Sequence, residues 1–240
     1  MQVGVSQRHV SFVESGKAKP SRTLLLSWLQ ALDAPLAVRN AAMLQAGFAP
    51  AYSAVPLHDP ALAQANAALI QLLAVHDPMP AFVIDAHWNV LHVNSGGRWL
   101  AATLMPHFAN LPAGTPLNML DMLAHPEGFA KHISNLTEVG PVLLAHLRME
   151  ASALPALNPK VEAFSALLHA RLGKQLNIQT QLNVPLLTTR FATEHGELAF
   201  FSMFTTFGTP QDITLASLRV EHMFAADEAT RAILKARVLG

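Results

Sequence analysis

The chain has 240 residues, of which 51% are hydrophobic and 13% are charged. This length suits one small and one medium domain, and the apolar fraction can fill a sizeable core and still supply a pocket or a subunit interface. The absence of cysteine excludes disulfides, zinc–thiolate sites, iron–sulfur ligation and a cysteine nucleophile. We expect a cytoplasmic protein with no membrane partner, because no apolar run is long enough to span a bilayer and the N-terminus has no secretory signal pattern.

The formal net charge of zero hides a difference between the two parts of the chain. Residues 1–50 carry five basic and two acidic side chains, whereas the remainder carries eleven basic and fourteen acidic ones. A basic N-terminal part followed by an acidic remainder is typical of a protein that contacts nucleic acid at one end. A chance fluctuation on a small count is the alternative.

The first 50 residues predict an all-α region of three short helices. Ser6 can cap a helix that runs to about Glu14 and ends at Gly16, because glycine accepts the left-handed conformation that follows many helices. Ser21 can cap a second helix, and a third is predicted over residues 35–45. The proline-rich residues 51–59 are interpreted as a linker.

Residues 60–230 predict a second domain that mixes strands with helices. The expected helices cover 61–75, 94–105, 118–123, 126–151 and 159–172. The expected strands cover 81–84, 88–93, 185–193, 198–207 and 213–220, and residues 231–240 are assigned to a C-terminal tail. Two strands, several helices and a three-stranded meander predict an α+β chain with a PAS-like antiparallel sheet of about five strands and helices on one face.

The order of residues 4–21, GVSQRHVSFVESGKAKPS, resembles the turn and recognition helix of Cro-like, xenobiotic-response-element (XRE) class helix-turn-helix repressors. The resemblance implies that residues just after the turn contact base edges in the major groove and that later basic residues meet phosphates. The DNA-contacting residues implied in this way are Ser6, Gln7, Arg8, Ser11, Lys17, Lys19 and Ser21. An ordinary capped surface helix is the alternative interpretation.

The helix-turn-helix resemblance is partial. A complete domain of this class has two helices before the recognition helix, whereas Met1 stands three residues before the turn. Without those helices Val5, Val10 and Val13 lose most of the surface that they should bury, at about 1.5 to 3 kcal/mol for each large aliphatic side chain. A start codon assigned too late, a fragment, or a sensor that has lost DNA binding would explain this, and we favour the first two.

Residues 58–230 are similar to the MmyB-type ligand-binding domain, which follows this class of helix-turn-helix in bacterial regulators and has a PAS-like fold. The linker phrase AGFAP at 46–50 also belongs to that combined architecture. The stretches that carry the similarity are PAFVID at 80–85 with Trp88, Asn89 and Asn94, HPEG at 125–128 with Asn135, FFS at 200–202, TTFGTP at 205–210 and DITL at 212–215.

The combined resemblance implies a ligand-responsive transcription regulator that binds operator DNA as a homodimer and senses an apolar small molecule, which in some members is thought to be fatty-acid-like. Candidate residues for the ligand site are Phe82, Ile84, Trp88, Leu91, Trp99, Leu136, Leu143, Phe201 and Met203. The alternative is that these side chains form a filled core. A second function, a lipid-like sensor or carrier that binds no DNA, also remains open.

The sequence offers little support for an enzyme, a cofactor or a metal site. The twelve histidines include no His-x-x-x-His pair on a zinc helix, and no Gly-x-Ser-x-Gly elbow or phosphate-binding loop is present. Gly96-Gly97 alone is too weak a signal for nucleotide binding. We therefore expect neither catalysis nor a bound metal.

Overall fold

The computed structural model describes residues 7–107, 112, 114–175 and 186–240, which form two compact units. The N-terminal unit combines residues up to 66 with residues 207–217, and the C-terminal unit combines residues 67–206 with 218–240. The N-terminal unit therefore contains a segment that the chain supplies from between two strands of the C-terminal unit.

Three helices form the start of the N-terminal unit, as the sequence predicts: α1 (Gln7–Glu14), α2 (Arg22–Ala31) and α3 (Leu36–Gln45). The Ser21 hydroxyl caps α2 by accepting a hydrogen bond from the Leu24 amide at 3.2 Å. Gly16 follows α1 with a φ of +71°, a left-handed conformation that glycine adopts without strain. Ser6, the predicted cap of α1, lies outside the described residues.

The segment interpreted as a linker begins with residues that are hydrogen-bonded into the N-terminal unit. The Asn40 side chain on α3 accepts from the amides of Ala51 and Tyr52 and donates to the Tyr52 carbonyl at 2.8 Å. The three-residue helix η1 (Pro60–Leu62) and the 14-residue helix α4 (Ala63–His76) then follow. Asn40 is buried because it satisfies these three backbone groups.

A single six-stranded antiparallel sheet forms the centre of the C-terminal unit, which confirms the α+β expectation. Its strands are β1 (Ala81–Ile84), β2 (Asn89–Val93), β3 (Leu117–Asn118), β4 (Thr189–Thr193), β5 (Gly196–Thr205) and β6 (Arg219–Ala225). The spatial order is β3-β2-β1-β6-β5-β4. The sixth strand is the two-residue β3, which is too short for a periodicity signal.

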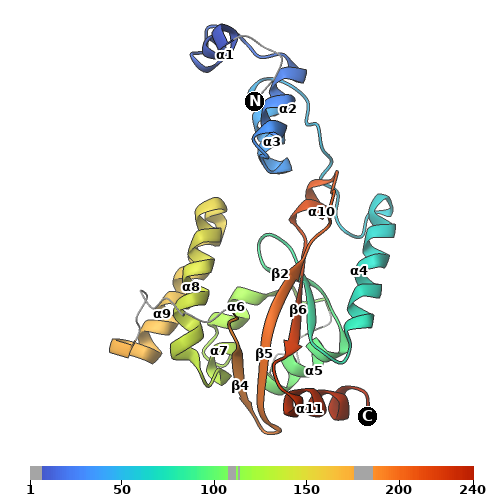
Figure 1. The fold of residues 1–240 in the computed structure, drawn as a ribbon, viewed down its shortest axis with the longest axis vertical. Helices are drawn as coiled ribbons and strands as arrows, with labels where there is room; N and C mark the ends of the chain where they lie inside the picture. Colours follow the sequence, from blue (N-terminus) through green and yellow to red (C-terminus); the bar gives the residue numbers. More distant parts are fainter. Residues whose placement is uncertain (1–6, 108–111, 113, 176–185) are drawn as a thin grey trace. The chain divides into compact units, whose positions relative to one another are not determined.

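Helices cover both faces of the sheet, not one face as the sequence suggested (Figure 1). On one face lie α5 (Ser95–Leu104), α6 (Met119–Ala124), α7 (Phe129–His132), α8 (Leu136–Ala153) and α9 (Asn158–Leu172). On the other lies α4, whose His76 ring packs edge-on against His222 and Phe224. The reason is that β6 carries apolar or aromatic side chains on both faces, so each face needs cover.

The helix predicted over 126–151 is interrupted between α7 and α8. Gly128 is the N-cap residue of α7, and its backbone lies close to the Met122 carbonyl oxygen. A Cβ at this position would lie 1.9 Å from that oxygen, so only glycine fits. Residues 133–135 leave the helical path because they pair with β4: Ile133 bridges Phe191, and the Ser134 amide donates to the Arg190 carbonyl. A contact distant in sequence therefore overrides local helix propensity.

Two C-terminal predictions are corrected by the structure. Residues 213–217 form the short helix α10 (Ile213–Ser217) before β6, because the Asp212 carboxylate accepts from the amides of Thr214 and Leu215. The predicted tail 231–240 mostly belongs to the helix α11 (Glu228–Val238), which buries Leu234 completely. The Asp227 side chain caps α11 by accepting from the Thr230 amide, a local signal that the interpretation as a tail overlooked.

Gly96 and Gly97 serve close packing at the start of α5. A Cβ on Gly96 would lie 2.2 Å from the Pro78 carbonyl oxygen, and one on Gly97 would lie 2.5 Å from the Val93 side chain. Asn94 caps the helix through the Gly97 amide at 2.8 Å. The two glycines therefore allow α5 to approach the sheet, and Leu100 of this helix lines the cavity described below.

Candidate ligand-binding cavity

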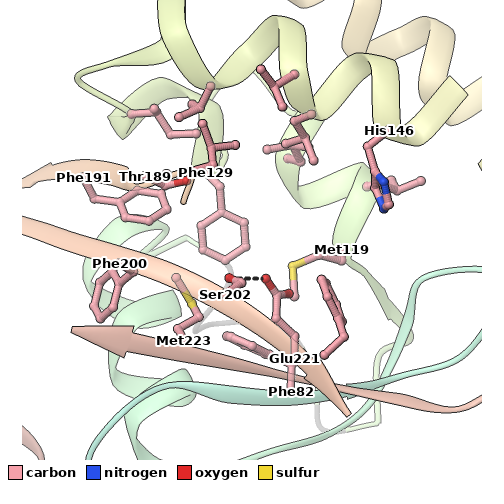
Figure 2. Close-up of a pocket in the computed structure, with 18 of the residues that line it drawn as sticks. Phe82, Met119, Phe129, His146, Thr189, Phe191, Phe200, Ser202, Glu221 and Met223 are labelled. Atoms are coloured by element: carbon pink, nitrogen blue, oxygen red, sulfur yellow. Dashed lines mark hydrogen bonds between the residues drawn. The ribbon is translucent and has the colours of Figure 1, made fainter. Parts of the chain in front are cut away.

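A cavity of about 410 Å³ lies between the sheet and the helices of the α8 side, entirely within the C-terminal unit. Strands β1, β4, β5 and β6 supply the sheet wall, with Phe82, Phe191, Phe200 and Met223 among its side chains. Helices α6 and α8 supply the opposite wall (Figure 2). The volume falls within the range of roughly 300 to 1,000 Å³ that is typical of small-molecule sites.

Strand alternation explains which sheet residues reach the cavity. On β5, Phe200, Ser202 and Phe204 line it, and on β6 Glu221 and Met223 do. Successive side chains of a strand point to opposite faces, so the residues between them point to the opposite face of the sheet, where His222 contacts α4. On β5 and β6 the lining is therefore apolar except where this alternation brings a serine and a glutamate to the same face.

Ser202 and Glu221 form a hydrogen-bonded pair on the sheet wall. The Ser202 hydroxyl donates to Oε1 of Glu221 at 2.8 Å, and both side chains are directed toward the helices (Figure 2). Burial raises the pKa of Glu221, and the Ser202 hydrogen bond and the Arg219 charge offset this only partly. The cavity thus holds a carboxyl group that gives up its proton less readily than an ordinary glutamate.

A second carboxylate, Glu150 on α8, joins that helix to the sheet beside the cavity. Arg219 on β6 donates two hydrogen bonds to it, at 2.7 Å and 2.9 Å, and the Trp88 indole N–H donates a third at 2.9 Å. The guanidinium carbon lies 4.2 Å from the centre of the Trp88 ring. This arrangement, called here the Glu150 clamp, holds Trp88 in the cavity wall.

The Glu150 clamp keeps its carboxylate ionised. Burial alone would raise the pKa of Glu150, but the hydrogen bonds and charge of Arg219, together with Trp88 and His146, lower it below its ordinary value. His146 contributes through its Nε2, which lies 2.9 Å from Oε1 of Glu150. The Nε of Arg219 is buried and has no hydrogen-bond partner within the described residues.

The family model of the MmyB-like transcription regulator ligand binding domain matches residues 65–236. The chain belongs to this family. Membership points to a ligand-responsive transcription regulator and argues against an enzymatic role. No curated protein matches the chain significantly.

The structure brings three of the nine predicted ligand-site residues to the cavity of the MmyB-like domain: Phe82, Trp88 and Leu143. Ile84 and Leu136 are buried in the surrounding core, and they are absent from the lining. Both β1 and α8 contribute to the cavity wall, since a short apolar strand and an apolar helix each turn a face to the core.

The remaining four predicted residues lie away from the cavity. Phe201 stacks on Phe224 on the opposite face, and Met203 is 53% exposed. Leu91 on β2 is also exposed, and the Trp99 ring stacks on His195 at 5.7 Å. On β5 the even-numbered residues line the cavity. The predicted residues Phe201 and Met203 are odd-numbered, and a shift of one residue along a strand moves a side chain to the other face.

Glu150, Ser202, Arg219 and Glu221 were missed because only apolar residues were considered for the site. The alternation of residues 219–225, with charged and apolar positions interleaved, was the signal that could have drawn attention to β6. The partner of Arg219 could not be found in this way, because Glu150 lies 69 residues away in the sequence.

The residues implied in DNA contact are exposed wherever the structure describes them. Gln7, Arg8 and Ser11 lie on α1, where an i, i+4 spacing puts Gln7 and Ser11 on one face. Lys17 and Lys19 are exposed in the following turn, whereas the Ser21 hydroxyl is engaged in capping α2. Val10 and Val13 are half-buried.

The described residues contain no group of three or more histidine, aspartate or glutamate side chains placed to hold a metal ion. The described helices also include none that is long and apolar enough to cross a membrane.

Proposed function

We propose that the protein is a DNA-binding transcription regulator whose MmyB-like domain senses an apolar small molecule with a fatty-acid-like body. The observation that carries this proposal is the path of β5 and β6. These strands supply Ser202, Phe204 and Glu221 to the cavity, and the chain between them, residues 207–217, belongs to the N-terminal unit.

Residues 207–217 are attached within the N-terminal unit by specific contacts. The Ser53 hydroxyl donates to the Asp212 carboxylate at 2.5 Å, and the Ile213 amide donates to the Ser53 carbonyl at 2.8 Å. Helix α10 also packs against α3. The strands that line the cavity are therefore covalently continuous with a segment anchored beside the predicted DNA-binding helices.

This connection supports a mechanism of population shift. A ligand that prefers one arrangement of β5 and β6 changes the population of conformations available to residues 207–217 and to the helices they contact. Two copies would place two α1 helices on half-sites about one helical turn apart, which multiplies the discrimination of a single helix. We propose a homodimer acting on operator DNA in the cytoplasm.

The test of ligand sensing uses Val142→Trp, which places a large side chain in the cavity from α8. Ala145→Trp is the matched control, because Ala145 is exposed on the same helix. Displacement of the fluorescent probe N-phenyl-1-naphthylamine and mass spectrometry of extracted molecules report on the cavity. We expect bound apolar material in the wild type and the control and its loss in Val142→Trp.

The test of DNA binding is selection of genomic fragments by the full chain at increasing salt, with and without the apolar probe. We expect retention that weakens steeply with salt, and a change in affinity on probe binding that Val142→Trp abolishes. Asp212→Ala should leave probe affinity unchanged while reducing its effect on DNA. Probe binding without DNA retention would indicate a sensor or carrier, and failure of both would overturn the proposal.

A further inference from the structure

Helix α4 lies on the surface of the C-terminal unit, yet it has the composition of a buried helix. Its 14 residues, AQANAALIQLLAVH, include no lysine, arginine, aspartate or glutamate. A helix that is apolar on all sides is normally buried on all sides. The surface helix α11 differs, since its 11 residues include two arginines, a lysine and a glutamate. The composition of α4 therefore predicts a cover on its outer side.

Within one copy of the chain, only one side of α4 is buried. Leu69 and Leu73, one turn apart, are buried, and the His76 ring packs on that of His222 at 4.7 Å. These positions follow the i, i+4, i+7 spacing of a single helix face. The other sides are open to solvent, and the exposed side chains there include Ala67, Ile70, Leu72, Ala74 and Val75.

The outer face of β5 extends this apolar surface. Met203 lies opposite His222 on the neighbouring strand β6, and it is 53% exposed. Phe201 stacks on Phe224 with ring centres 5.4 Å apart, and the Phe224 ring in turn contacts His76 of α4. The exposed side chains of α4 named above, together with Phe201 and Met203, are called here the α4 patch. It lies on the side of the sheet opposite α8 (Figure 1).

We infer that the α4 patch is the interface of a homodimer, in which the patch of one copy packs on the same patch of the other. The inference rests on the proposed function, which requires two DNA-reading helices in one complex. Contiguous apolar patches on soluble proteins mark interaction surfaces. Because the chain has no net charge, two copies do not repel each other near neutral pH. A two-fold axis brings identical patches together, and an uncharged patch meets no like charge there.

Nucleic acid and membrane surfaces fit the α4 patch less well than a second copy. Both are bound through lysine and arginine side chains, and the patch contains neither. In a pair of copies, Ile70 and Val75 of one can pack over Ala67 and Ala74 of the other. Helix α4 also continues directly from the N-terminal unit, so a pair formed here connects two such units through the adjoining chain.

The exposed area of the α4 patch predicts how strong the pairing is. Val75 is 78% exposed, and Ile70 is 50% exposed. With their neighbours they offer roughly 500 Å² on each copy, against about 800 Å² in a standard interface. We therefore expect a reversible dimer with a dissociation constant in the micromolar range.

Sedimentation velocity of the full chain, from about 1 to 100 μM at neutral pH, measures this equilibrium. We expect the wild type to change from monomer to dimer across the range. The double variant Ala67→Glu with Val75→Glu should dimerise at least about tenfold more weakly, because like charges would meet across the two-fold axis. The double variant Ala145→Glu with Met149→Glu makes matched changes on the exposed side of α8, and it should dimerise like the wild type.

Cross-linking locates the interface directly. Because the chain contains no cysteine, a single introduced cysteine reports on one position. Gln71 is exposed on α4, and Gln71→Cys should yield covalent dimers with a short bismaleimide at concentrations where the wild type is dimeric. Ala145→Cys on α8 should not. If the double glutamate variant of α4 does not fold, the cross-linking result decides the question.

Two outcomes would overturn the inference. A wild type that stays monomeric would do so, and slow reaction of Gln71→Cys with a maleimide would then show that the chain itself covers α4. An α4 double variant that dimerises like the wild type would show that the homodimer uses another surface, and the proposed function would keep its dimer. Ligand sensing is measured separately by displacement of N-phenyl-1-naphthylamine, since neither Ala67 nor Val75 lines the cavity.

Discussion

Two glutamates border the same cavity and have opposite surroundings. Glu150 accepts hydrogen bonds from Arg219 and Trp88, and its pKa is lowered. Glu221 has one serine partner in an apolar wall, and its pKa is raised. The comparison teaches that hydrogen-bond partners determine the surroundings of a carboxyl group: Glu150 joins a helix to the sheet, whereas Glu221 lies in the cavity wall with a serine as its partner.

Removal of the Glu150 carboxylate should have the largest effect. Glu150→Gln leaves the mostly buried Arg219 without its counter-ion, so we expect a loss of about 2 to 3 kcal/mol in the free energy of unfolding. Urea denaturation measures this loss. Glu162→Gln, at an exposed site, should change stability by less than about 0.5 kcal/mol, and an equally small effect at Glu150 would show that the clamp is not structural.

The pH dependence of stability should have opposite signs for the two glutamates. Glu150 ionises more readily in the folded state, so its contribution is present above the ordinary value of 4.5 and is lost as pH falls through the lowered folded pKa. Glu221 keeps its proton longer when folded, so its ionisation reduces stability as pH rises above 4.5.

Urea denaturation at several pH values, with Glu150→Gln and Glu221→Gln as references, measures both trends. The stability of the wild type relative to Glu150→Gln should rise with pH, and that relative to Glu221→Gln should fall. Slopes of the same sign would remove the distinction between the two residues.

Trp88→Phe should have a smaller effect on the Glu150 clamp. Phenylalanine keeps an aromatic ring against Arg219 but has no N–H to donate to Glu150. We expect a loss of about 1 kcal/mol in the free energy of unfolding, measured by urea denaturation. In the double variant with Glu150→Ala, which has no acceptor for the indole N–H, this loss should disappear, and an additive effect would mean that the indole acts only through its packing.

Ser202→Ala should have the smallest effect on stability, less than about 0.5 kcal/mol, because Ser202 is exposed. It should nevertheless raise the pKa of Glu221 further, since the serine hydroxyl stabilises the ionised form. Carboxyl chemical shifts followed by NMR across a pH titration measure this change. An unaltered titration would show that the hydrogen bond is not maintained in solution.

Much of the fold follows from local signals. The caps at Ser21 and Asn94 mark helix starts because a side-chain acceptor satisfies free amides within three residues. The β1–β2 hairpin follows from its turn, where Asp85 accepts from the amides of His87 and Asn89. The break between α7 and α8 was not predictable, since it depends on pairing between Ile133 and Phe191.

The sequence by itself determined the α+β class, most helices and the resemblance to the MmyB-like family, because caps, periodicity and motifs are local. Only the tertiary structure decided the phase of β5, the partnership of Glu150 with Arg219, and the inclusion of residues 207–217 in the N-terminal unit. Each depends on contacts between distant parts of the chain: the Ser53–Asp212 pair, for example, joins residues 159 positions apart. Such contacts leave no periodic pattern in the sequence, so neither this pair nor the Arg219–Glu150 pair beside the cavity could be predicted from it.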